Sequence, residues 1–289
     1  MFDRIYVEIG NICNMSCSFC AGTKRAPKRM SAREFEEVCK KLFGFGENLY
    51  FHVMGEPLLH PELDKFLKIA KAYGYKVSIT TNGTLLKKAE PILFENADAI
   101  HRVSVSLHAP EGNGIYALDT YLDSAFSFAK EFSAIDKNVV FRLWNLDTSD
   151  REGDNSLNAK ILERLKETYT GEWIKRYSGY RIAYRTFLEF DGIFTWPSES
   201  CAEPKEEGRC HALTRQIAIL ADGTVVPCCL DSDGSMPLGN IFVSDMSDIL
   251  EGELAKQMKK GFEAHKMVHP VCQKCTYARR FTLGNKNGD

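Results

Sequence analysis

Three cysteines near the start of the chain constrain it more than any other feature of the sequence. Cys13, Cys17 and Cys20 are spaced C-x3-C-x2-C, and Phe19 precedes the last of them. They lie among Asn, Ser and Gly rather than in an apolar run, where free cysteine packs as a small hydrophobe. Closed [4Fe–4S] sites and all-sulfur zinc sites take four cysteines. Three thiolates can instead satisfy three irons of a cubane and leave the fourth iron open to a small molecule.

The composition narrows the class of protein. Of 289 residues, 44% are hydrophobic and 26% charged, which is ordinary for a globular chain that can bury a sizeable core. The net charge of −2 gives no electrostatic basis for binding nucleic acid, and no apolar run reaches the ~18 residues of a membrane helix. The first residues lead directly into a strand-like segment, so we expect no signal peptide. Ten cysteines then indicate metal sites in a reducing compartment, and we expect a cytoplasmic protein that works where oxygen is scarce.

Residue periodicity divides the first two thirds of the chain into alternating strands and helices. Ser31 and Glu34 form a capping box at the start of one helix, Pro61 and Gly74 are placed to begin and end the next, and Thr84 is placed to cap a third. The predicted buried stripe of the second helix is Leu63, Phe66, Leu67 and Ala70. The predicted strands are 2–9, 49–54, 75–81, 100–107, 139–146 and 181–190, and the later helices are 116–132 and 157–168.

Six strands that alternate with helices predict a parallel sheet, because each crossover between parallel neighbours is a helix. Six β/α units fall short of the eight in a closed barrel. We therefore predict an α/β fold in which residues 1–198 form an open (β/α)6 partial TIM barrel. The chemistry of such a fold sits at the carboxyl ends of its strands, and the cysteine segment follows the first strand directly.

The pattern changes after Pro197, and we predict that residues 199–289 form a small C-terminal extension built from a β-hairpin and a helix. The hairpin turn would contain Asp222 and Gly223. The predicted elements are a polar linker at 199–208, the hairpin strands at 216–220 and 225–229, and the helix at 246–261.

The spacing C-x3-C-x2-C with Phe19 resembles the signature of the radical S-adenosylmethionine (radical SAM) superfamily. The core fold of that family is the partial barrel predicted above. The resemblance implies a [4Fe–4S] cluster held by Cys13, Cys17 and Cys20, with Phe19 among the cofactor-binding residues. It also implies that the amino and carboxylate groups of SAM chelate the open iron.

Two strand ends match positions that such enzymes use for the methionine part of SAM. After the second strand, Gly55 and Glu56 resemble the family's Gly-Gly-Glu motif, although Met54 replaces the first glycine. The resemblance implies that the Gly55 backbone and the Glu56 carboxylate accept the SAM ammonium group. After the third strand, Asn82 lies in a Thr-Asn-Gly turn that is also similar to the family pattern.

The next two strands carry matching residues as well. Ser104 and Ser106 place both hydroxyls on one face of the fourth strand, and Ser106 is the better match for a carboxylate contact. On the fifth strand, Arg142 matches the residue that pairs with the SAM carboxylate, and Asn145 matches one near the ribose and adenine. Each match alone is weak, but they follow in order, one for each strand.

The C-terminal extension carries a second cysteine set. Cys210 and Cys228 are spaced C-x12-G-x4-C, which resembles the opening of the SPASM extension of radical SAM enzymes. Only Cys272 and Cys275 follow, which fits the shorter twitch variant. The resemblance implies one auxiliary [4Fe–4S] cluster held by these four cysteines, and a structural Zn(Cys)4 site is the alternative.

Cys229 adjoins one of these predicted ligands. In an extended strand, Cys228 and Cys229 would point to opposite faces, so both cannot easily face one cluster. Cys229 is then either a packed thiol or, as in the radical SAM peptide epimerases that share a Cys-Cys pair, a hydrogen-atom donor to the substrate radical. We expect Cys39 to be buried in the core and His52 to have a structural role. His108 either has a structural role or faces the substrate. We assign no role to Cys201.

The resemblance implies an enzyme that reductively cleaves SAM to a 5′-deoxyadenosyl radical, which abstracts a hydrogen atom from a peptide or small molecule. We expect an oxidised product, from dehydrogenation or cross-linking, with epimerisation through Cys229 as the alternative. An external electron donor such as flavodoxin or ferredoxin is the expected partner, with no nucleic acid or membrane. An iron–sulfur electron carrier without catalysis is the alternative of another class, but it leaves Glu56, Ser106 and Arg142 without a purpose.

Overall fold

The computed structural model describes residues 1–113, 117–148, 152–197, 200 and 202–281. Its strands are β1 Arg4–Val7, β2 Asn48–Phe51, β3 Lys76–Thr81, β4 Ile100–Ser106, β5 Asn138–Leu146, β6 Ile174–Arg176, β7 Gly179–Ala183, β8 Thr186–Gly192, β9 Gln216–Ile219, β10 Thr224–Val226 and β11 Gly239–Asn240. Its α-helices are α1 Ala32–Lys41, α2 Leu63–Ala72, α3 Leu86–Glu95, α4 Leu118–Ala134, α5 Asn155–Thr168, α6 Met246–Leu250, α7 Glu253–Glu263 and α8 Pro270–Gln273. Short 3₁₀ turns lie at η1 Pro57–Leu59, η2 Ala97–Ala99 and η3 Ala278–Arg280.

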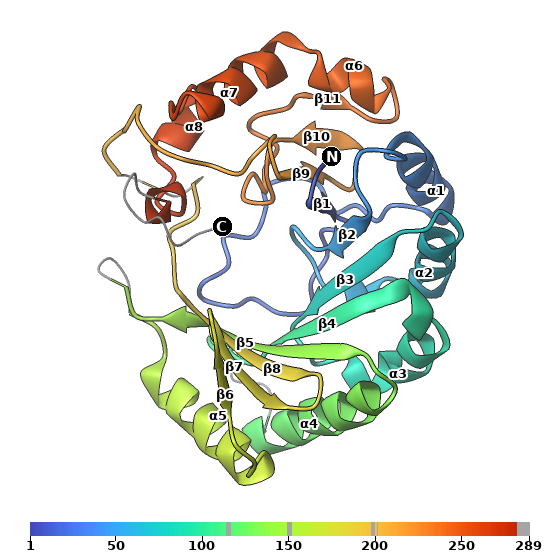
Figure 1. Ribbon diagram of the computed structural model, residues 1–289, viewed down its shortest axis with the longest axis vertical. Coiled ribbons are helices and arrows are strands. Elements are labelled where there is room, and N and C mark those ends of the chain that lie inside the picture. Colours follow the sequence, from blue (N-terminus) through green and yellow to red (C-terminus); the bar gives the residue numbers. More distant parts are fainter. Residues whose placement is uncertain (114–116, 149–151, 198–199, 201, 282–289) are drawn as a thin grey trace.

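The described strands form one sheet in the order β11-β10-β9-β1-β2-β3-β4-β5-β8-β7-β6. Neighbours from β9 to β8 run parallel, and the two ends of the sheet are antiparallel. Figure 1 shows the curved sheet with α1 to α4 on its convex side. The predicted open, partial barrel is therefore confirmed. No helix in the described ranges is long and apolar enough to cross a membrane.

Two faces of the sheet have different characters, because successive strand residues point to opposite sides. Outward residues such as Val103 and Val105 of β4 are fully buried against the helices and belong to the main core. The capping box of Ser31 and Glu34 is present at the start of α1, and the predicted buried stripe of α2 is confirmed. The inward face is more polar and carries Arg142, Ser104 and other hydrophilic side chains.

Several boundaries differ from the prediction. Residues 181–190 form two antiparallel strands rather than one, because the chain turns before β8 with Arg185 at a φ of +48°. The predicted helix at 246–261 is two helices, with Gly252 as the N-cap of the second. The helix expected to begin at Pro61 begins at Leu63, and Thr84 does not cap α3, whose N-cap is Leu85.

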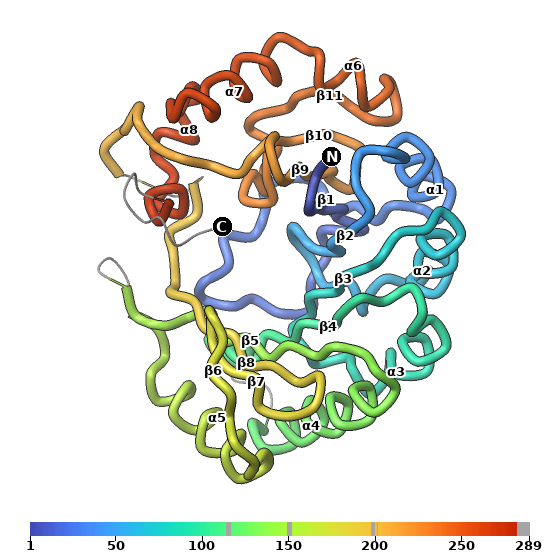
Figure 2. Tube along the Cα trace, in the orientation of Figure 1, coloured from blue at the N-terminus to red at the C-terminus, as the bar shows by residue number. Residues whose placement is uncertain are grey.

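The C-terminal extension continues the sheet of the barrel. β9 pairs in parallel with β1, from Arg4 opposite Gln216 to Val7 opposite Ile219. β10 then returns antiparallel to β9, with Gly223 at a φ of +85° in the predicted turn. Figures 1 and 2 show β9 to β11 beside β1, with α6 to α8 beyond them. The domain boundary at residues 198 and 199 stays a prediction, because both residues lie outside the described ranges.

Candidate functional site

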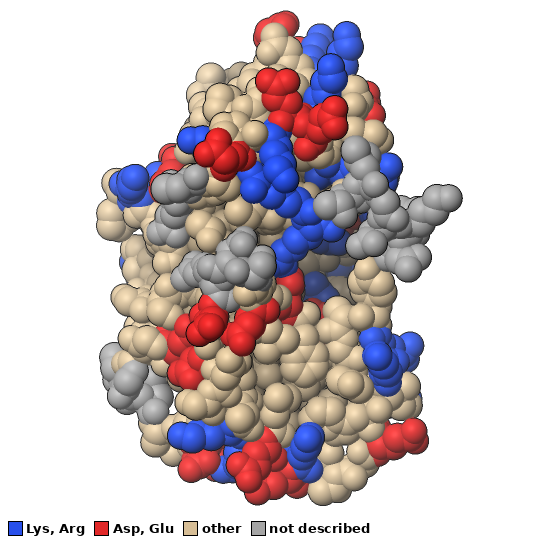
Figure 3. All heavy atoms as spheres, turned by 90° about the vertical axis from the view of Figure 1, so that its left-hand side faces the viewer, with Lys and Arg blue, Asp and Glu red and all other residues tan. Residues whose placement is uncertain are grey.

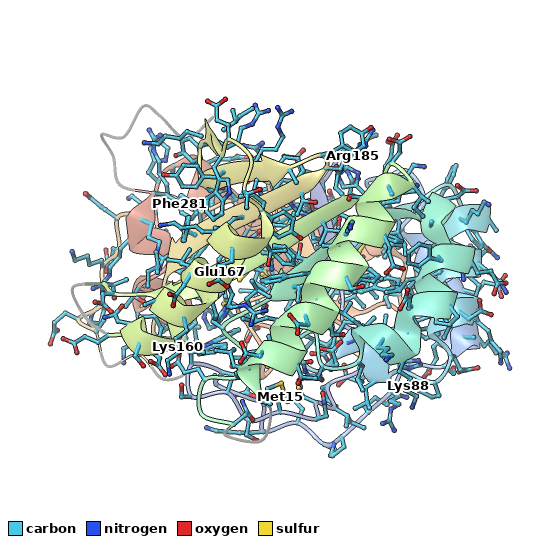
Figure 4. The ribbon with its side chains drawn as sticks, turned by 90° about the horizontal axis from the view of Figure 1, so that it is seen from below. Met15, Lys88, Lys160, Glu167, Arg185 and Phe281 are labelled. Carbon is cyan, nitrogen blue, oxygen red and sulfur yellow. The ribbon has the colours of Figure 1, made fainter. Side chains whose placement is uncertain are left out.

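The cysteine loop lies at the carboxyl ends of the parallel strands. It connects β1 to α1, and in Figure 2 this segment of the trace crosses the open interior of the ring of strands. Figure 4 places Met15, between the first two cysteines, and Arg185, just before β8, at opposite ends of α4. The loop is therefore on the side of the sheet where the strands end, as predicted for the site.

Each of the three loop thiols accepts a hydrogen bond from a nearby N–H group. Asn82 Nδ2 donates to Cys13 Sγ over 3.8 Å, Asn113 Nδ2 to Cys17 Sγ over 3.5 Å and the Gly22 amide to Cys20 Sγ over 3.4 Å. Such bonds to sulfur tune iron–sulfur clusters. The three sulfur atoms and the N–H groups that donate to them therefore have the chemistry that a cluster requires.

Burial, outweighing the Asn113 hydrogen bond, raises the pKa of Cys17 to about 11, and the neighbouring Cys20 and Cys13 thiols raise it further. The three thiols are thus close enough to interact, and a bound metal would favour the thiolate form of Cys17. Within the described ranges, no group of three or more His, Cys, Asp or Glu side chains is arranged to hold a metal ion. The cluster ligands Cys13, Cys17 and Cys20 remain a prediction supported by donor chemistry.

The loop after β2 brings a glycine and a buried acid to the same end of the sheet. Gly55 has a φ of +82°, and a Cβ there would lie 2.2 Å from the Gly10 carbonyl oxygen, so the position requires glycine. Glu56 is 4% exposed and accepts from the Thr81 hydroxyl over 2.7 Å and from the Leu58 and Asn82 amides over 2.9 and 2.7 Å. A carboxylate offers about four lone-pair sites, so about one remains for an ammonium group.

Burial raises the pKa of Glu56 to about 7, although these three hydrogen bonds oppose the shift. Asn82 links Glu56 to the cysteine loop, since its side chain also donates to Asn14 Oδ1 over 3.0 Å. The predicted acid and the predicted turn therefore form one connected unit with the cysteine loop.

Arg142 of β5 projects from the inner face of the sheet and is 5% exposed. Its Nη1 donates to Thr80 Oγ1 over 3.2 Å, and its guanidinium lies 4.0 Å from the centre of the Trp144 ring. Arg142 Nε has no hydrogen-bond partner among the described residues. Burial, assisted by the nearby Arg102 guanidinium, lowers the pKa of Arg142 to about 10, so it stays cationic at neutral pH. A buried cation with a free donor is suited to an anionic ligand.

The other predicted SAM residues have distinct surroundings. Ser106 lies opposite Arg142 in the β4–β5 register, and Ser104 is buried one pair earlier on the same face. Asn145 is fully buried, and its Nδ2 donates to Glu111 Oε2 over 2.7 Å, while its Oδ1 has no partner in the described chain. Glu111 also accepts from Ser18 Oγ over 2.6 Å. It therefore ties the end of β5 to the cysteine loop.

Sequence reasoning missed Glu111 and Asn113, which follow β4 and contact the cysteine loop. No spacing in the sequence marks them, because each acts across more than ninety residues on Ser18 or Cys17. The sequence does place both residues just after a predicted strand end, where site residues are expected in such a fold.

Phe19 packs against His108, with ring centres 4.6 Å apart, and its carbonyl oxygen accepts from Trp196 Nε1 over 3.0 Å. His108 Nδ1 lies 3.0 Å from the Arg142 carbonyl oxygen. Burial lowers the pKa of His108 to about 4, so its ring is neutral at physiological pH. His108 therefore has a packing role here, which favours the structural alternative.

Four cysteines of the C-terminal extension line one small cavity of about 40 Å³. They are Cys210, Cys228, Cys272 and Cys275. The remaining lining is almost entirely apolar, and a single water needs only ~10–15 Å³ of such volume. Burial raises the pKa of Cys210 to about 11 and that of Cys228 well above its usual range, with the neighbouring thiols adding to the latter shift. The donor set fits a four-thiolate centre, and its ligands stay a prediction.

Cys229 faces away from that cavity and toward the inner face of the barrel. The expectation that it lies in an extended strand is wrong, because β10 ends at Val226 before Pro227, which lacks an N–H. Cys229 instead packs with Tyr6 and Tyr50 in a small inner cluster. Burial raises its pKa to about 11, and a hydrogen bond with the Tyr6 hydroxyl opposes the shift. Cys39 is fully buried in the main core as predicted, and Cys201 lies outside the described residues.

Comparison with known families decides which group of proteins this architecture represents. Residues 7–123 match the model of the radical SAM superfamily, and residues 210–276 match SPASM, an iron–sulfur cluster-binding domain. The chain is a radical SAM protein with a C-terminal SPASM domain. The first match contains the cysteine loop and β2 to β4, and the second contains the four later cysteines. The superfamily and the iron–sulfur extension expected from the sequence are thus confirmed.

Curated relatives of this radical SAM protein are distant. The antilisterial bacteriocin subtilosin biosynthesis protein AlbA of Bacillus subtilis (strain 168) is 22% identical, and the alignment covers 94% of this chain and 64% of AlbA. The S-adenosyl-L-methionine-dependent 2-deoxy-scyllo-inosamine dehydrogenase of Niallia circulans is 20% identical, with 95% of this chain and 93% of the dehydrogenase covered. One relative is thus named as a bacteriocin biosynthesis protein and the other as a dehydrogenase.

Solved structures agree with the fold. BtrN in complex with AdoMet and 2-DOIA has a TM-score of 0.58 at 21% identity, covering 96% of this chain and 93% of BtrN. Streptococcus suis SuiB bound to the precursor peptide SuiA has a TM-score of 0.60 at 16% identity, covering 95% of this chain and 71% of SuiB. At these identities the likeness establishes the shared architecture.

Proposed function

We propose that this protein binds SAM at the carboxyl ends of β2 to β5, cleaves it reductively and removes a hydrogen atom from a peptide or small-molecule substrate. The observation that carries the proposal is the meeting of Arg142, Glu56 and the cysteine loop at one end of the sheet. A non-catalytic electron carrier would not require these side chains. An external donor such as flavodoxin or ferredoxin would supply electrons, and the cytoplasm is the proposed location.

Cys13, Cys17 and Cys20 would hold a [4Fe–4S] cluster, which when bound supplies the electron that cleaves SAM to methionine and a 5′-deoxyadenosyl radical. The chain's own residues orient SAM. The cationic guanidinium of Arg142, opposite Ser106, would bind the SAM carboxylate, and the remaining lone-pair site of Glu56 would accept its ammonium group. Gly55 allows close approach of backbone because it carries no Cβ.

Bonds within the chain keep these groups in place. Thr81 and Asn82 fix the Glu56 carboxylate, and Thr80 fixes one end of Arg142. Asn145 is held by Glu111, which leaves its free Oδ1 as an acceptor for the adenine or ribose of SAM. Such prior orientation lowers the entropy lost when the reacting groups meet.

We propose that the product is oxidised, by dehydrogenation or cross-linking. Cys210, Cys228, Cys272 and Cys275 would hold an auxiliary [4Fe–4S] cluster beside the barrel, and a four-thiolate site fully supplied by the chain suits electron transfer rather than substrate ligation. The dehydrogenase relative of Niallia circulans performs an oxidation, as its name states, which supports the same reaction class.

The proposal is tested by reconstituting the protein anaerobically with iron and sulfide, adding dithionite and SAM, and measuring 5′-deoxyadenosine by chromatography. We expect two clusters, about eight irons per chain, from one three-cysteine and one four-cysteine site. The triple change of Cys13, Cys17 and Cys20 to Ala should remove about half of the iron and all SAM cleavage. Cys39→Ala is the matched control, because that thiol is buried in the main core and should leave cleavage intact. SAM cleavage that survives the triple change would refute the proposal.

Hydrogen return by Cys229 is the second candidate function, and the contact of this thiol with Tyr6 on the inner face favours it. A donor thiol would give a product with the substrate's mass, plus one deuterium when the reaction runs in heavy water. Cys229→Ala would then still form 5′-deoxyadenosine but stall the product. A product two hydrogens lighter, with Cys229→Ala nearly silent, would support oxidation instead. Mass spectrometry of one turnover in heavy water separates the two outcomes.

A further inference from the structure

The inner face of the sheet carries buried N–H groups that meet no acceptor in the described chain. They are Nε of Arg102 on β4, and Nε of Arg142 and Nε1 of Trp144 on β5. Strand alternation places Arg102 on the face opposite the outward Val103, and Arg142 and Trp144 share a face because they are two residues apart. All three groups are donors only, so their ligand must be rich in acceptors.

A row of polar side chains continues this surface across the neighbouring strands. Tyr6, Tyr50, Ser78 and Arg102 are consecutive register partners on β1 to β4, and Ser78 Oγ also has no partner among the described residues. The guanidinium of Arg102 lies 5.8 Å from the centre of the Tyr50 ring. Ser78 and Arg102 thus place a hydroxyl and a guanidinium side by side on the inner face of the sheet. We name the set Tyr6, Tyr50, Ser78 and Arg102 the inner row.

Positive charge on this face exceeds negative charge. Glu189 of β8 is the carboxylate nearest to Arg102, at 3.8 Å, which is longer than a hydrogen bond. It is also the register partner of Arg142. Two guanidiniums therefore share one carboxylate. Burial, Arg142 and Arg102 together lower the pKa of the neighbouring His52 ring, which is consistent with an excess of cations here.

Basic side chains also lie on the open side of the sheet. The left-hand side of Figure 1, where the curved sheet is open, faces the viewer in Figure 3. There, Lys and Arg side chains gather in a band near a recess in the middle of that face, and Asp and Glu side chains lie directly beside the band.

We propose that the substrate presents a carboxylate or a phosphate to Arg102, with Ser78, its register partner, as a further hydrogen-bond donor. The inference rests on the proposed function, in which Arg142 is already paired with the SAM carboxylate, and it adds the chemical class of the substrate. The geometry suits an acidic peptide side chain or a phosphorylated or carboxylated small molecule. A substrate with an amine at this position would face two guanidiniums and would be disfavoured.

The test uses the reconstituted holoenzyme saturated with SAM, so that Arg142 is occupied. Inorganic phosphate, succinate and ethanolamine are titrated anaerobically by calorimetry as a phosphate, a carboxylate and an amine probe. We expect one or both anions to bind and Arg102→Met to weaken that binding at least tenfold. Arg102→Lys keeps the charge but lacks the Nε donor. Its anion affinity should lie between those of the parent and of Arg102→Met. Arg176→Met is the matched control, because it removes an exposed arginine from a strand, and should bind as the parent does.

Binding of phosphate alone would assign a phosphate group, and binding of succinate alone a carboxylate. Equal anion affinity in the parent and Arg102→Met, no anion binding at all, or tighter binding of ethanolamine would overturn the inference. The circular dichroism of each variant checks its fold, and Arg102→Lys keeps the test valid if Arg102→Met does not fold. Loss of SAM cleavage in the parent would instead refute the proposed function, so the two failures are distinguishable.

Discussion

A buried ion pair joins the cysteine loop to the C-terminal extension, and its removal should have a large effect. Arg25 Nη2 donates to both oxygens of the fully buried Glu8 over 2.8 and 2.7 Å, and Arg25 Nε donates to the Ser232 carbonyl over 2.8 Å. Glu8 also accepts from the Met54 amide over 3.2 Å and the Ala221 amide over 3.1 Å. One carboxylate thus connects β1, the loop after β2 and the turn after β9.

Arg25→Met removes all three arginine bonds and leaves the Glu8 charge buried with only two amide donors. Breaking one side of a buried pair costs about 3–5 kcal/mol. At about 2 °C per kcal/mol, the lower end of the range for large domains, the melting temperature should fall by roughly 6–10 °C. The assay is anaerobic calorimetry of the holoenzyme at one fixed scan rate, together with the rate of 5′-deoxyadenosine formation. That rate should also fall, because the segment that loses its anchor follows Cys20 directly.

Two controls distinguish the loss of this buried ion pair from the removal of an arginine charge in general. Arg33→Met removes an exposed arginine and should leave the melting temperature unchanged. The double variant Glu8→Gln with Arg25→Met removes the stranded charge, so it should be more stable than Arg25→Met alone. Arg25→Met that melts within 1 °C of Arg33→Met, or a double variant less stable than the single one, would refute the reasoning.

Three further predictions concern the SAM site. Arg142→Ala should weaken SAM binding by about 1.5–3 kcal/mol, the worth of a hydrogen bond to a charged group, without loss of iron; equal affinity by calorimetry would contradict this role. Gly55→Ala should lower the melting temperature because of its positive φ and the Gly10 carbonyl, whereas Gly171→Ala, with open space around it, should not. Burial raises the Glu56 pKa from 4.5 to about 7, so its stabilising contribution is complete below pH 4.5 and is lost as pH rises through 7. Without SAM, the protein should melt lower at pH 8 than at pH 6, and Glu56→Gln should reduce that difference.

The sequence predicts local elements well where periodicity and caps are strong. The stripe of α2 and the capping box of α1 follow from side chains within one or two turns of helix. The turn before β8 was missed because Arg185 takes a positive φ, which is rare for a residue other than Gly, Asn or Asp, and no such residue marks the place. Apolar alternation continues across it and imitates one strand.

Long-range contacts could not be predicted in the same way. A hairpin pattern shows that β9 and β10 pair with each other, but it does not show that β9 also pairs with β1. The bond between Glu8 and Arg25, and the bonds of Glu111 and Asn113 to the cysteine loop, depend on elements brought together only by the folded sheet. The positions of Glu56 and Arg142 were predictable because Glu56 follows its own strand and Arg142 lies within its own.

The pairing of β1 with β9 has a consequence during synthesis on the ribosome. Arg25 precedes its partner Ser232 by 207 residues, which corresponds to roughly 10–40 s at 5–20 residues per second. Throughout this interval the nascent chain presents one edge of β1 and the cysteine loop without their final neighbours. A cluster inserted into the cysteine loop before the chain leaves the ribosome would therefore bind a loop that lacks its contact with Ser232. The contacts of the cysteine loop are therefore complete only after the last third of the chain has been synthesised, although that part is far from the first cysteines in sequence.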